Sequence, residues 1–422
     1  MTAPDSAPPP TRRLPALHWQ ILAAIVVALV AGLAFRATGV DPDGALMQAI
    51  GFVGDGFLRL LKFIIVPLVL ASVVVGVSSI DARNLGRLGG KTLLFYGVTT
   101  SLSVVVGLIA VNLVKPGVGV SVETDYVPPV EPTPLADVFL NIVPINPFAA
   151  LGASFDLLSV IFFGIVFGIA VSVVGEPAEP LSRFFKALDA VMMKITDWVM
   201  ALAPLGIAAL LLELVVQLGA DIIGDLAKYM GTVAGALFFH AVVILPALVF
   251  FLGRVNPLHV ARALSPALLT AFSTASSAST LPVTMECVEE RAGADGRVGA
   301  FVLPLGATVN MDGTALYEAV AAIFIAQAFG FDLSMGMQVT IFLTATLAAV
   351  GAAGVPSAGL VTMIIVLEAV GLPLEGIGLL VAVDRILDMM RTTVNVWGDA
   401  CGAVVIAASE GMLDEGRLAD PS

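Results

Sequence analysis

Five polar residues in the last apolar segment of the chain have types and a spacing that could do chemistry: Asp384, Asp388, Arg391, Asn395 and Asp399. Successive members are four, three, four and four residues apart. At about 100° per residue, this spacing predicts one polar stripe along a helix face. A guanidinium binds a carboxylate through a fork of two hydrogen bonds, and a buried carboxylate selects an ammonium group. The stripe therefore indicates a binding site for small charged molecules.

The charge balance of the stripe leaves two interpretations open. Asp388 and Arg391, at i and i+3, could simply neutralise each other in a structural network. Charged side chains at membrane depth cost a few kcal/mol each, however, and are rarely kept without a partner or a task. The three acids of the stripe outnumber Arg385 and Arg391, and such a surplus of negative charge is what a cation site requires.

A second polar motif, Asn310-Met-Asp-Gly-Thr314, lies in an earlier apolar segment. It follows the run Pro304-Leu-Gly-Ala-Thr308. Proline and glycine are expected to unwind the helix here and to free carbonyl oxygens, which hard cations such as sodium prefer. A proline kink with a hydrogen-bonded asparagine is the structural alternative.

The composition places the whole chain in a lipid bilayer. Of its 422 residues, 58% are hydrophobic and 13% are charged, which excludes an ordinary soluble protein. The formal net charge of −13 would repel nucleic acid. The two cysteines, Cys287 and Cys401, lie far apart and outside any CxxC motif, so the sequence indicates neither a disulfide framework nor a zinc site.

The apolar runs predict eight membrane spans, because a helix needs about 20 mostly apolar residues to cross the hydrocarbon core. The spans are expected near residues 17–37, 46–78, 90–114, 138–174, 184–217, 226–252, 298–328 and 374–408. The first run could instead belong to a signal peptide. It is long for one and lacks a convincing small-residue cleavage site, so we expect a retained span.

Basic residues predict the orientation of these spans. Clusters of lysine and arginine precede the first span and follow the second, fourth and sixth spans, which places all four clusters on one side: Arg12 and Arg13; Arg83, Arg87 and Lys91; Arg183 and Lys186; Arg254 and Arg262. Cytoplasmic loops carry the excess of lysine and arginine, so this side, with both termini, is expected in the cytoplasm.

Two apolar stretches, Ser265–Met285 and Leu343–Val366, are broken at their middles by small and turn-forming residues. Each could be one kinked span. Basic residues flank the first stretch on both sides, with Arg262 before it and Arg291 after it, which favours a re-entrant hairpin. Irregular backbone at membrane depth is tolerated only in buried positions or beside a watery cavity, so the hairpins predict a substrate path.

The two stretches also indicate an internal repeat. Leu281-Pro-Val-Thr-Met285 in the first is echoed by Gly359-Leu-Val-Thr-Met363 in the second. Each is followed by a span with an amide-rich motif, at Asn310 and at Asn395. Transporters are often built from inverted repeats whose broken elements meet at the membrane midplane.

Together these motifs resemble the glutamate transporter family, the dicarboxylate/amino acid:cation symporters, over essentially the whole chain. The matching motifs occur in the family's order and spacing: the serine-rich run 273–282, Asn310–Thr314, Gly354–Gly359 and Asp388–Asn395. The resemblance implies an all-α polytopic membrane protein with eight transmembrane helices, two re-entrant helical hairpins and inverted repeats. It also implies a homotrimer.

The resemblance further implies a division into a scaffold and a mobile transport domain. The implied scaffold consists of residues 1–80, with the N-terminal tail and helices 1–2, and residues 136–220, with helices 4–5. The implied transport domain consists of residues 81–135, with helix 3 and an outer loop, and residues 221–410, with the remaining helices and both hairpins. Residues 411–422 are the C-terminal tail.

The same resemblance assigns the substrate site. It implies that Arg391 holds a side-chain carboxylate with help from Thr314, that Asp388 holds the ammonium group, and that Asn395 and Ser277 take the α-carboxylate. The full implied set is Ser276, Ser277, Thr314, Val355, Gly359, Asp388, Arg391, Thr392 and Asn395. Asp388 would repel a plain dicarboxylate and Arg391 would be unpaired opposite a neutral amino acid, so aspartate or glutamate is expected.

Sodium is the co-transported ion that the resemblance implies, at three sites. One would use Asp399 with backbone oxygens of Gly306, Asn310 and Asn395; another would use Asp312 with Tyr96, Thr99, Thr100 and Asn310; the third would use backbone oxygens near Thr308, Ala349 and Ala352. Glu318 matches a position at which proton-coupled relatives carry a proton, so proton coupling in addition to sodium stays open.

The chain departs from the family at one feature. Members usually have an extra arginine beside the substrate, at the position of Ala275 or of Met389. Arg385, about one turn before Met389, could substitute for it, or could pair with Asp384. This departure leaves open how substrate binding couples to domain motion.

The sequence therefore predicts a secondary active symporter of acidic amino acids, driven by sodium through elevator-type alternating access, and not an enzyme. Rivals within the class are a proton-driven dicarboxylate carrier and a neutral amino acid carrier. An ion channel is the rival of another class, because re-entrant hairpins also build pores. Short outward loops without an Asn-X-Ser/Thr sequon suit a bacterial inner membrane.

Overall fold

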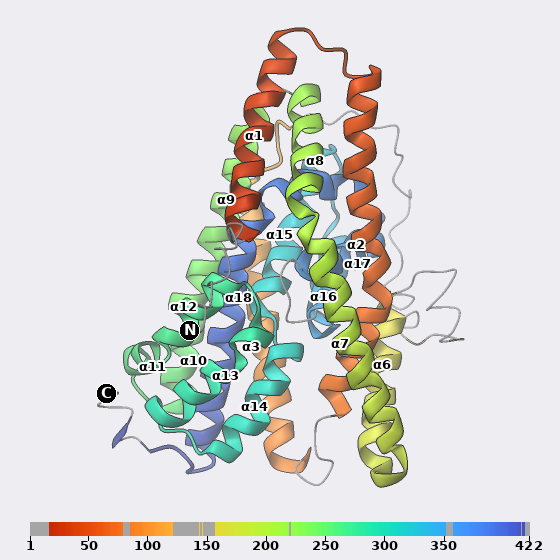
Figure 1. Ribbon diagram of the computed structural model, residues 1–422. Coiled ribbons are helices and arrows are strands. Elements are labelled where there is room, and N and C mark those ends of the chain that lie inside the picture. The colour runs from red at the N-terminus through yellow and green to blue at the C-terminus, as the bar shows by residue number, and fades with distance from the viewer. Residues whose placement is uncertain are drawn as a thin grey trace, which may run out of the picture.

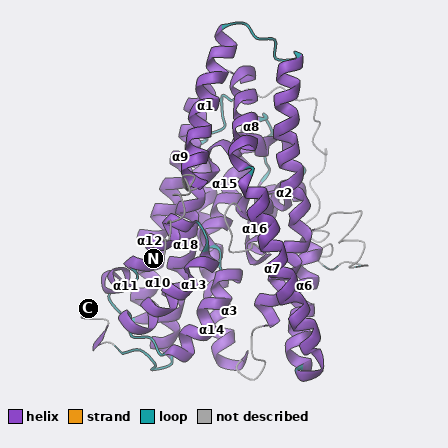
Figure 2. Ribbon diagram, viewed as in Figure 1, coloured by secondary structure: helices purple, strands orange, loops and turns teal. Residues whose placement is uncertain are grey.

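The computed structural model describes residues 17–78, 85–120, 143, 146, 157–218, 221–351, 358–414 and 416–417. Over these residues the regular structure consists of helices and one isolated β-bridge, between Ala294 and Leu413 (Figure 2). The prediction of an all-α fold is confirmed.

The α-helices are named in chain order, as labelled in Figure 1. They are α1 (Leu17–Ala37), α2 (Ala45–Ser78), α3 (Gly90–Val114), α6 (Leu157–Val174), α7 (Glu179–Ala201), α8 (Ala203–Leu218), α9 (Asp221–Phe239), α10 (Leu245–Leu248), α11 (Pro257–Ala263), α12 (Ser265–Thr274), α13 (Ser277–Glu286), α14 (Gly296–Val309), α15 (Asp312–Ala328), α16 (Met335–Gly351), α17 (Ala358–Ala369) and α18 (Ile377–Ser409). Short π-helical turns at 240–244 and 249–253 continue α9 and α10.

Several of these helices are long and apolar enough to cross a membrane. Within the described ranges there are five: Trp19–Ala37, Ala45–Ser78, Arg87–Val114, Ile223–Gly253 and Gly296–Ala328. Helices α7 and α8 make a sixth if they count as one span with a bend of 49°. The 33 residues of α18 would also reach across, but they carry the charged stripe. The protein is therefore a multi-pass membrane protein.

One group of helices consists of α1, α2, α6, α7 and α8. Helix α1 packs against α8, and α2 packs against α6, α7 and α8 (Figure 1). Small residues allow these close approaches, as is usual for helices in lipid. A Cβ atom added to Gly164 of α6, for example, would lie 3.0 Å from Val73 Cγ1 of α2. The guanidinium of Arg36 closes the end of α8, because its Nη1 donates to the carbonyls of Val216 and Gln217 at 2.8 Å each.

The second group surrounds α15 and α18. Helix α15 packs against α3, α16, α17 and α18, while α18 also packs against α9, α12, α13 and α14. A helix that is hydrophobic all round belongs in the interior, and every residue of α15 except Gln327 is buried. The two central helices thus carry their polar residues into a protein interior and away from lipid.

The long helix made by α14 and α15 is interrupted at Asn310 and Met311. Their φ/ψ values are −108°/89° and −119°/63°, outside the helical region. The predicted unwinding is therefore confirmed. Pro304 does not itself make the break, because α14 continues past it to Val309.

Two pairs of short helices occupy the stretches that the sequence marked as broken. Between α12 and α13, Ala275 adopts the left-handed conformation with a φ of 51°, and the extended Ser276 accepts the N–H of Ser279 at 3.2 Å as the helix cap. Helices α16 and α17 pack against each other. Residues 352–357, which connect them and include Ala352 and Val355, lie outside the described residues.

The beginning of α3 is tied to the end of α18 by charged residues. Lys91 Nζ donates to Ser409 Oγ at 3.0 Å and to the carboxylate of Glu410. Arg87 Nε also lies 3.1 Å from Glu410 Oε1. The hydrogen bond from Lys91 lowers the pKa of the Glu410 carboxyl below its usual value. These contacts place the basic start of α3 on the same side of the molecule as the end of α18.

Candidate functional site

The polar stripe of α18 is buried against its neighbours. All five members are buried, and Arg391 is among the largest fully buried side chains of the described residues, with 1% of its surface exposed. Helices α14 and α15 pack against α18. The sequence-based prediction that these residues share one face is confirmed. Buried charges are stable only when paired or hydrogen-bonded, so each partner matters.

Arg391 lies at the centre of the buried charges. Its Nη2 donates to Asp388 Oδ1 at 2.8 Å and lies 2.9 Å from Asp384 Oδ1. Its Cζ atom is 3.9 Å from the centre of the Tyr317 ring, a geometry in which the ring attracts the cation. Nε and Nη1 have no hydrogen-bond partner among the described residues. The guanidinium is thus fixed through Nη2, while its Nε and Nη1 donors, on different edges of the group, remain for a ligand.

Helix α17 brings its backbone directly to this guanidinium at Gly359. A Cβ atom at Gly359 would lie 2.8 Å from Arg391 Nη1 and 3.0 Å from Cζ. Any side chain at this position would therefore displace the guanidinium or occupy the place of its ligand. Of the predicted closing segment from Val355 to Gly359, only its last residues, from Ala358 on, lie within the described part of the chain.

Asp388 lies between two guanidinium groups. Arg391 binds its Oδ1, and Arg385 Nη1 lies 3.6 Å from its Oδ2. The sequence left open whether Arg385 pairs with Asp384. The structure instead pairs Asp384 with Arg391 and directs Arg385 to Asp388.

Asn395 joins α18 to the first turn of α15. Its Oδ1 accepts the backbone N–H of Gly313 at 2.8 Å, and its Nδ2 donates to Thr314 Oγ1 at 3.2 Å. Because Asn395 lies one helix turn after Arg391 on α18, its contact with Thr314 places Thr314 about one turn along α18 from Arg391. Three further predicted substrate residues are also buried: Ser276, Ser277 and Thr392. Ser277 belongs to α13, which packs against α18.

A second cluster of polar groups surrounds the break between α14 and α15. Asn310 Nδ2 donates to Asp399 Oδ1 at 3.0 Å, and Asn310 Oδ1 accepts the hydroxyl of Thr99 at 3.2 Å. Thr100 Oγ1 donates to Asp312 Oδ1 at 2.8 Å. All five side chains are buried. Two carboxylates with amide and hydroxyl oxygens are the donor set of a hard cation such as sodium.

Gly306 and Tyr96 complete the surroundings of Asp399. A Cβ atom at Gly306 would contact both the Asp399 carboxylate and the Tyr96 hydroxyl, so glycine lets these oxygens reach the backbone of α14. The Tyr96 hydroxyl donates to the carbonyl of Val302 at 2.9 Å. The first two predicted cation sites are therefore adjacent to each other and share Asn310.

The third predicted cation site is described only in part. Thr308 lies in α14, where its hydroxyl donates to the carbonyl of Leu305 at 3.1 Å. Ala349 is buried in α16, which packs against α14. Ala352 lies outside the described residues.

Reasoning from the sequence missed His240. Its Nε2 lies 3.3 Å from Asp312 Oδ2, and neither side chain has exposed surface. The residue begins a π-helical turn that continues α9. The only sign of this contact in the sequence was a single histidine within an apolar run, because Asp312 lies 72 residues further along the chain.

Glu318 is fully buried one turn beyond Thr314 on α15. One of its carboxylate oxygens accepts the hydroxyl of Thr362 from α17. Sequence reasoning predicted Glu318 as a proton carrier and missed Thr362. This contact joins α15 to the helix that carries Gly359.

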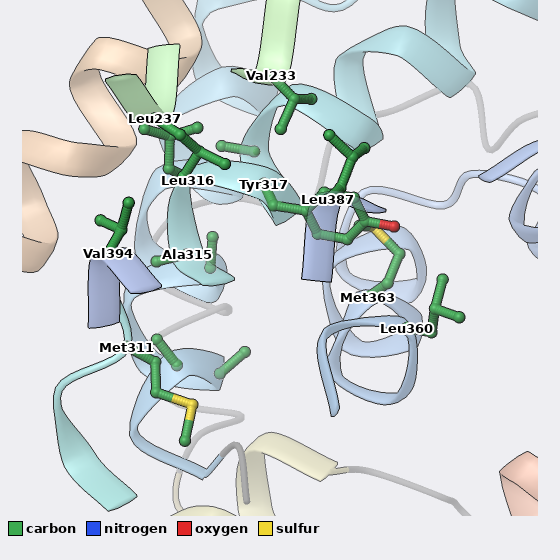
Figure 3. Close-up of a cluster of buried hydrophobic side chains, with 14 of the residues drawn as sticks. Val233, Leu237, Met311, Ala315, Leu316, Tyr317, Leu360, Met363, Leu387 and Val394 are labelled. Carbon is green, nitrogen blue, oxygen red and sulfur yellow. The ribbon is translucent and has the colours of Figure 1, made fainter. Parts of the chain in front are cut away.

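Apolar side chains from several helices enclose the buried charges. Figure 3 shows a cluster in which α9 contributes Val233 and Leu237, α17 contributes Leu360 and Met363, and α18 contributes Leu387 and Val394. Tyr317, whose ring faces Arg391, belongs to the same cluster. An apolar wall lowers the local dielectric and strengthens every charge interaction beside it.

Comparisons with known proteins show what this chain is similar to. Residues 17–409 match the family model described as the sodium:dicarboxylate symporter family. An excitatory amino acid transporter of Caenorhabditis elegans is 39% identical, over 91% of this chain and 86% of its own. A proton/sodium-glutamate symport protein of Bacillus caldotenax is 36% identical, over 94% and 96% respectively. Excitatory amino acid transporter 3 of Mus musculus is 37% identical, over 96% and 88%.

If the polar cluster around Asn310 binds sodium, removing the charge of Asp399 should weaken sodium binding. Asp399→Asn keeps an acceptor for Asn310 and removes the charge, so we expect the sodium concentration that half-stabilises the purified protein to rise about tenfold or more. The measurement is the melting temperature against NaCl at constant ionic strength with choline chloride.

The matched control is Asp189→Asn, which removes a carboxylate that accepts the hydroxyl of Ser72 at 2.9 Å, away from this cluster. It should leave the sodium midpoint unchanged. Equal midpoints for both variants would remove Asp399 from the cation site.

Proposed function

Because the chain belongs to the sodium:dicarboxylate symporter family, we propose that it is a secondary active symporter that carries aspartate or glutamate together with sodium. The family consists of transporters, so the protein is not an enzyme. The observation that carries the substrate proposal is the buried pair of Arg391 and Asp388, which offers one cation and one anion to the same ligand.

The pair favours an amino acid with an acidic side chain. The open donors of Arg391, Nε and Nη1, suit a carboxylate, and Asp388 suits an ammonium group. A neutral amino acid would leave the guanidinium without an anionic ligand, and a dicarboxylate without an amine would face Asp388. The names of the relatives support this choice, because they include glutamate symport proteins and excitatory amino acid transporters.

Further residues are proposed to complete the substrate site. Thr314 would assist Arg391, Asn395 and Ser277 would take the α-carboxylate, and the segment ending at Gly359 would cover the ligand. Their support is burial and proximity: Asn395 bonds Thr314, and Gly359 lies against Arg391.

The cations are proposed to bind beside the substrate. Asp399 and Asp312, with Asn310, Thr99 and Thr100, would hold sodium, which supplies the electrochemical driving force. The connection to the substrate site supports this arrangement. Asn310 and Asp312 bound the break before α15, and the next residue after Asp312, Gly313, donates its N–H to Asn395.

Replacing the guanidinium tests the substrate class. Arg391→Cys removes the cationic group for the side-chain carboxylate, so uptake of L-aspartate and L-glutamate into liposomes should fall at least tenfold while a neutral amino acid such as L-serine is taken up no less than before. Arg297→Cys, which removes an exposed arginine paired with Asp295, serves as the control.

An equal loss of acidic and neutral substrates in Arg391→Cys would count against the assignment. Counterflow of labelled aspartate in the same liposomes separates a carrier from a channel, since only a carrier exchanges external for internal substrate.

Glu318 is proposed to carry a proton across the membrane, so that transport is coupled to protons as well as to sodium. If it does, an inward proton gradient imposed without a sodium gradient should accelerate aspartate uptake. In Glu318→Gln this acceleration should disappear while the response to sodium remains. Exposed Glu179, replaced by Gln, is the control. A proton response that survives in Glu318→Gln would reject this role.

The finer architecture is also a proposal: eight spans, two re-entrant hairpins and inverted repeats. The helix pairs α12–α13 and α16–α17 support it, because each contains a break in the stretch where the sequence predicts a hairpin tip. Each pair is followed by a helix with a buried amide, Asn310 or Asn395. One set of helices, α16 to α18, would thus repeat the arrangement of α12 to α15.

The division into scaffold and transport domain has support from packing. Helices α1, α2, α6, α7 and α8 pack on one another, in agreement with scaffold ranges 1–80 and 136–220. The charged stripe and both helix pairs lie in the other group, with proposed ranges 81–135 and 221–410. An apolar cavity of about 240 Å³ is lined by α2 and α6 on one side and by α3, α14 and α16 on the other, and beside it α2 and α6 contact α14 and α16 directly. Such an apolar boundary would let the second group slide as a unit in an elevator-type cycle.

The scaffold is proposed to hold three copies together in a homotrimer, in a bacterial inner membrane with both termini in the cytoplasm. The contact of Lys91 with Ser409 and Glu410 supports the orientation, since it joins the basic start of α3 to the end of α18, and basic residues are in excess on the cytoplasmic side.

A disulfide across the boundary tests the elevator. A Cβ atom at Gly76 of α2 lies 3.2 Å from Thr308 Cβ of α14, close enough for a bridge after Gly76→Cys and Thr308→Cys. In a background without the native cysteines, oxidation should stop aspartate uptake, sodium-dependent aspartate binding should persist, and reduction should restore uptake.

The matched control bridges two helices within one group. A Cβ atom at Gly164 of α6 lies 3.3 Å from Val73 Cβ of α2, so Gly164→Cys and Val73→Cys should form a bridge that spares uptake. Undiminished uptake by the fully oxidised Gly76–Thr308 pair would reject the proposed motion.

A further inference from the structure

The π-helical turn that continues α9, residues 240–244, takes one backbone carbonyl away from its usual helical donor. This carbonyl belongs to Ala241. In an α-helix it would accept the N–H of Leu245, but that N–H donates to the carbonyl of His240 instead. The next residue, Pro246, has no N–H to donate. A carbonyl at membrane depth needs a partner from the protein, because the bilayer core holds no water.

Trp397 of α18 supplies this partner. Its indole Nε1 donates to the carbonyl of Ala241 at 3.0 Å. The Trp397 side chain is buried, with 5% of its surface exposed, and the indole ring has only this one donor. The hydrogen bond therefore ties the π-helical turn after α9 to the turn of α18 that lies between Asn395 and Asp399.

The tied segment carries His240, which contacts the proposed cation site. His240 directly precedes Ala241, and its Nε2 lies 3.3 Å from Asp312 Oδ2. The other carboxylate oxygen, Asp312 Oδ1, accepts the hydroxyl of Thr100 at 2.8 Å. Since an ionised carboxylate can only accept, His240 Nε2 must carry the hydrogen of this contact. These two donors fix the direction in which Asp312 presents its oxygens.

The residue after Trp397 meets the same carboxylate. A Cβ atom at Gly398 would lie 3.0 Å from Asp312 Oδ2 and 3.2 Å from Asn310 Nδ2. Glycine therefore lets the backbone of α18 approach Asp312 on one side, while His240 contacts it from α9. The hydrogen bond of Trp397 joins these two helices at the level of the carboxylate.

We propose that Trp397 is a positioning residue for sodium binding, because its hydrogen bond to Ala241 keeps His240 against Asp312. This inference rests on the proposed function and deepens it: the geometry of one proposed sodium ligand depends on a residue that does not touch the ion. Groups that orient the ligands of a metal ion typically contribute about 10–100-fold to its affinity. Trp397 acts one contact further away, so its contribution should be smaller.

The test measures the melting temperature of the purified full-length protein against NaCl, at constant ionic strength with choline chloride. Trp397→Phe keeps an aromatic ring and removes the donor, so the sodium concentration that half-stabilises the protein should rise about threefold or more. His240→Ala should raise this midpoint about tenfold or more. The matched control is Trp198→Phe in α7, since Trp198 is 63% exposed, and it should leave the midpoint unchanged.

A double variant separates positioning from a purely structural role. If Trp397 acts through His240, Trp397→Phe combined with His240→Ala should have the midpoint of His240→Ala alone, within about twofold. If Trp397 only packed α18 against α9, its replacement would lower the melting temperature equally at every sodium concentration. That uniform loss, or a double variant in which the two single effects multiply, would overturn the proposal.

Asp312→Asn distinguishes the failure of this inference from the failure of the proposed cation site. If Asp312→Asn raises the sodium midpoint and Trp397→Phe does not, the role of Trp397 is rejected and the cation site stands. An unchanged midpoint in Asp312→Asn would reject both. Where Trp397→Phe does not fold, His240→Ala decides, since an unchanged midpoint there removes the residue through which Trp397 acts.

Discussion

The burial of the Arg391 guanidinium is the constraint on which the rest of this structure depends. A cation with 1% exposure is tolerable only with anionic and aromatic partners, and Asp384, Asp388 and the ring of Tyr317 supply them. To bring these groups together, α15 must lie beside α18 and be buried almost completely. Gly359 of α17 must also approach without a side chain. The proposed substrate site and the packing of these helices therefore depend on the same contacts.

The break between α14 and α15 extends this constraint to the proposed cation site. An uninterrupted helix would use its backbone groups in its own hydrogen bonds, whereas Asn310 and Met311 leave the helical conformation. Asn310 then joins Asp399 of α18 to Thr99 of α3, while Gly313, just past the break, donates to Asn395. A change around Asn310 thus reaches Asn395, a proposed substrate residue, through a few hydrogen bonds. This continuity is a physical basis for coupling ion binding to substrate binding.

Much of the fold was predictable because lipid imposes simple rules. Apolar length predicted the long helices such as α2 and α3, and small or turn-forming residues predicted the breaks at Ala275 and at Asn310. The bend of 49° between α7 and α8 was not predicted, because both helices are apolar and their angle depends on the helices they pack against. His240 and Thr362 were missed for a related reason. Each is an ordinary residue until Asp312 or Glu318 is placed next to it.

The sequence by itself determined that Asp384, Asp388, Arg391, Asn395 and Asp399 share a helix face, because helical periodicity depends only on spacing. Their partners were decided by the tertiary structure. Asp384 pairs with Arg391 and Arg385 faces Asp388, although Asp384 and Arg385 are neighbours in sequence. Residues one apart point about 100° away from each other on a helix, whereas Arg385 and Asp388, three apart, are neighbours. Asp384 and Arg391 are seven apart, two turns along the same face, and the long arginine side chain spans that distance. Which of those neighbours meet is then decided by the surrounding helices.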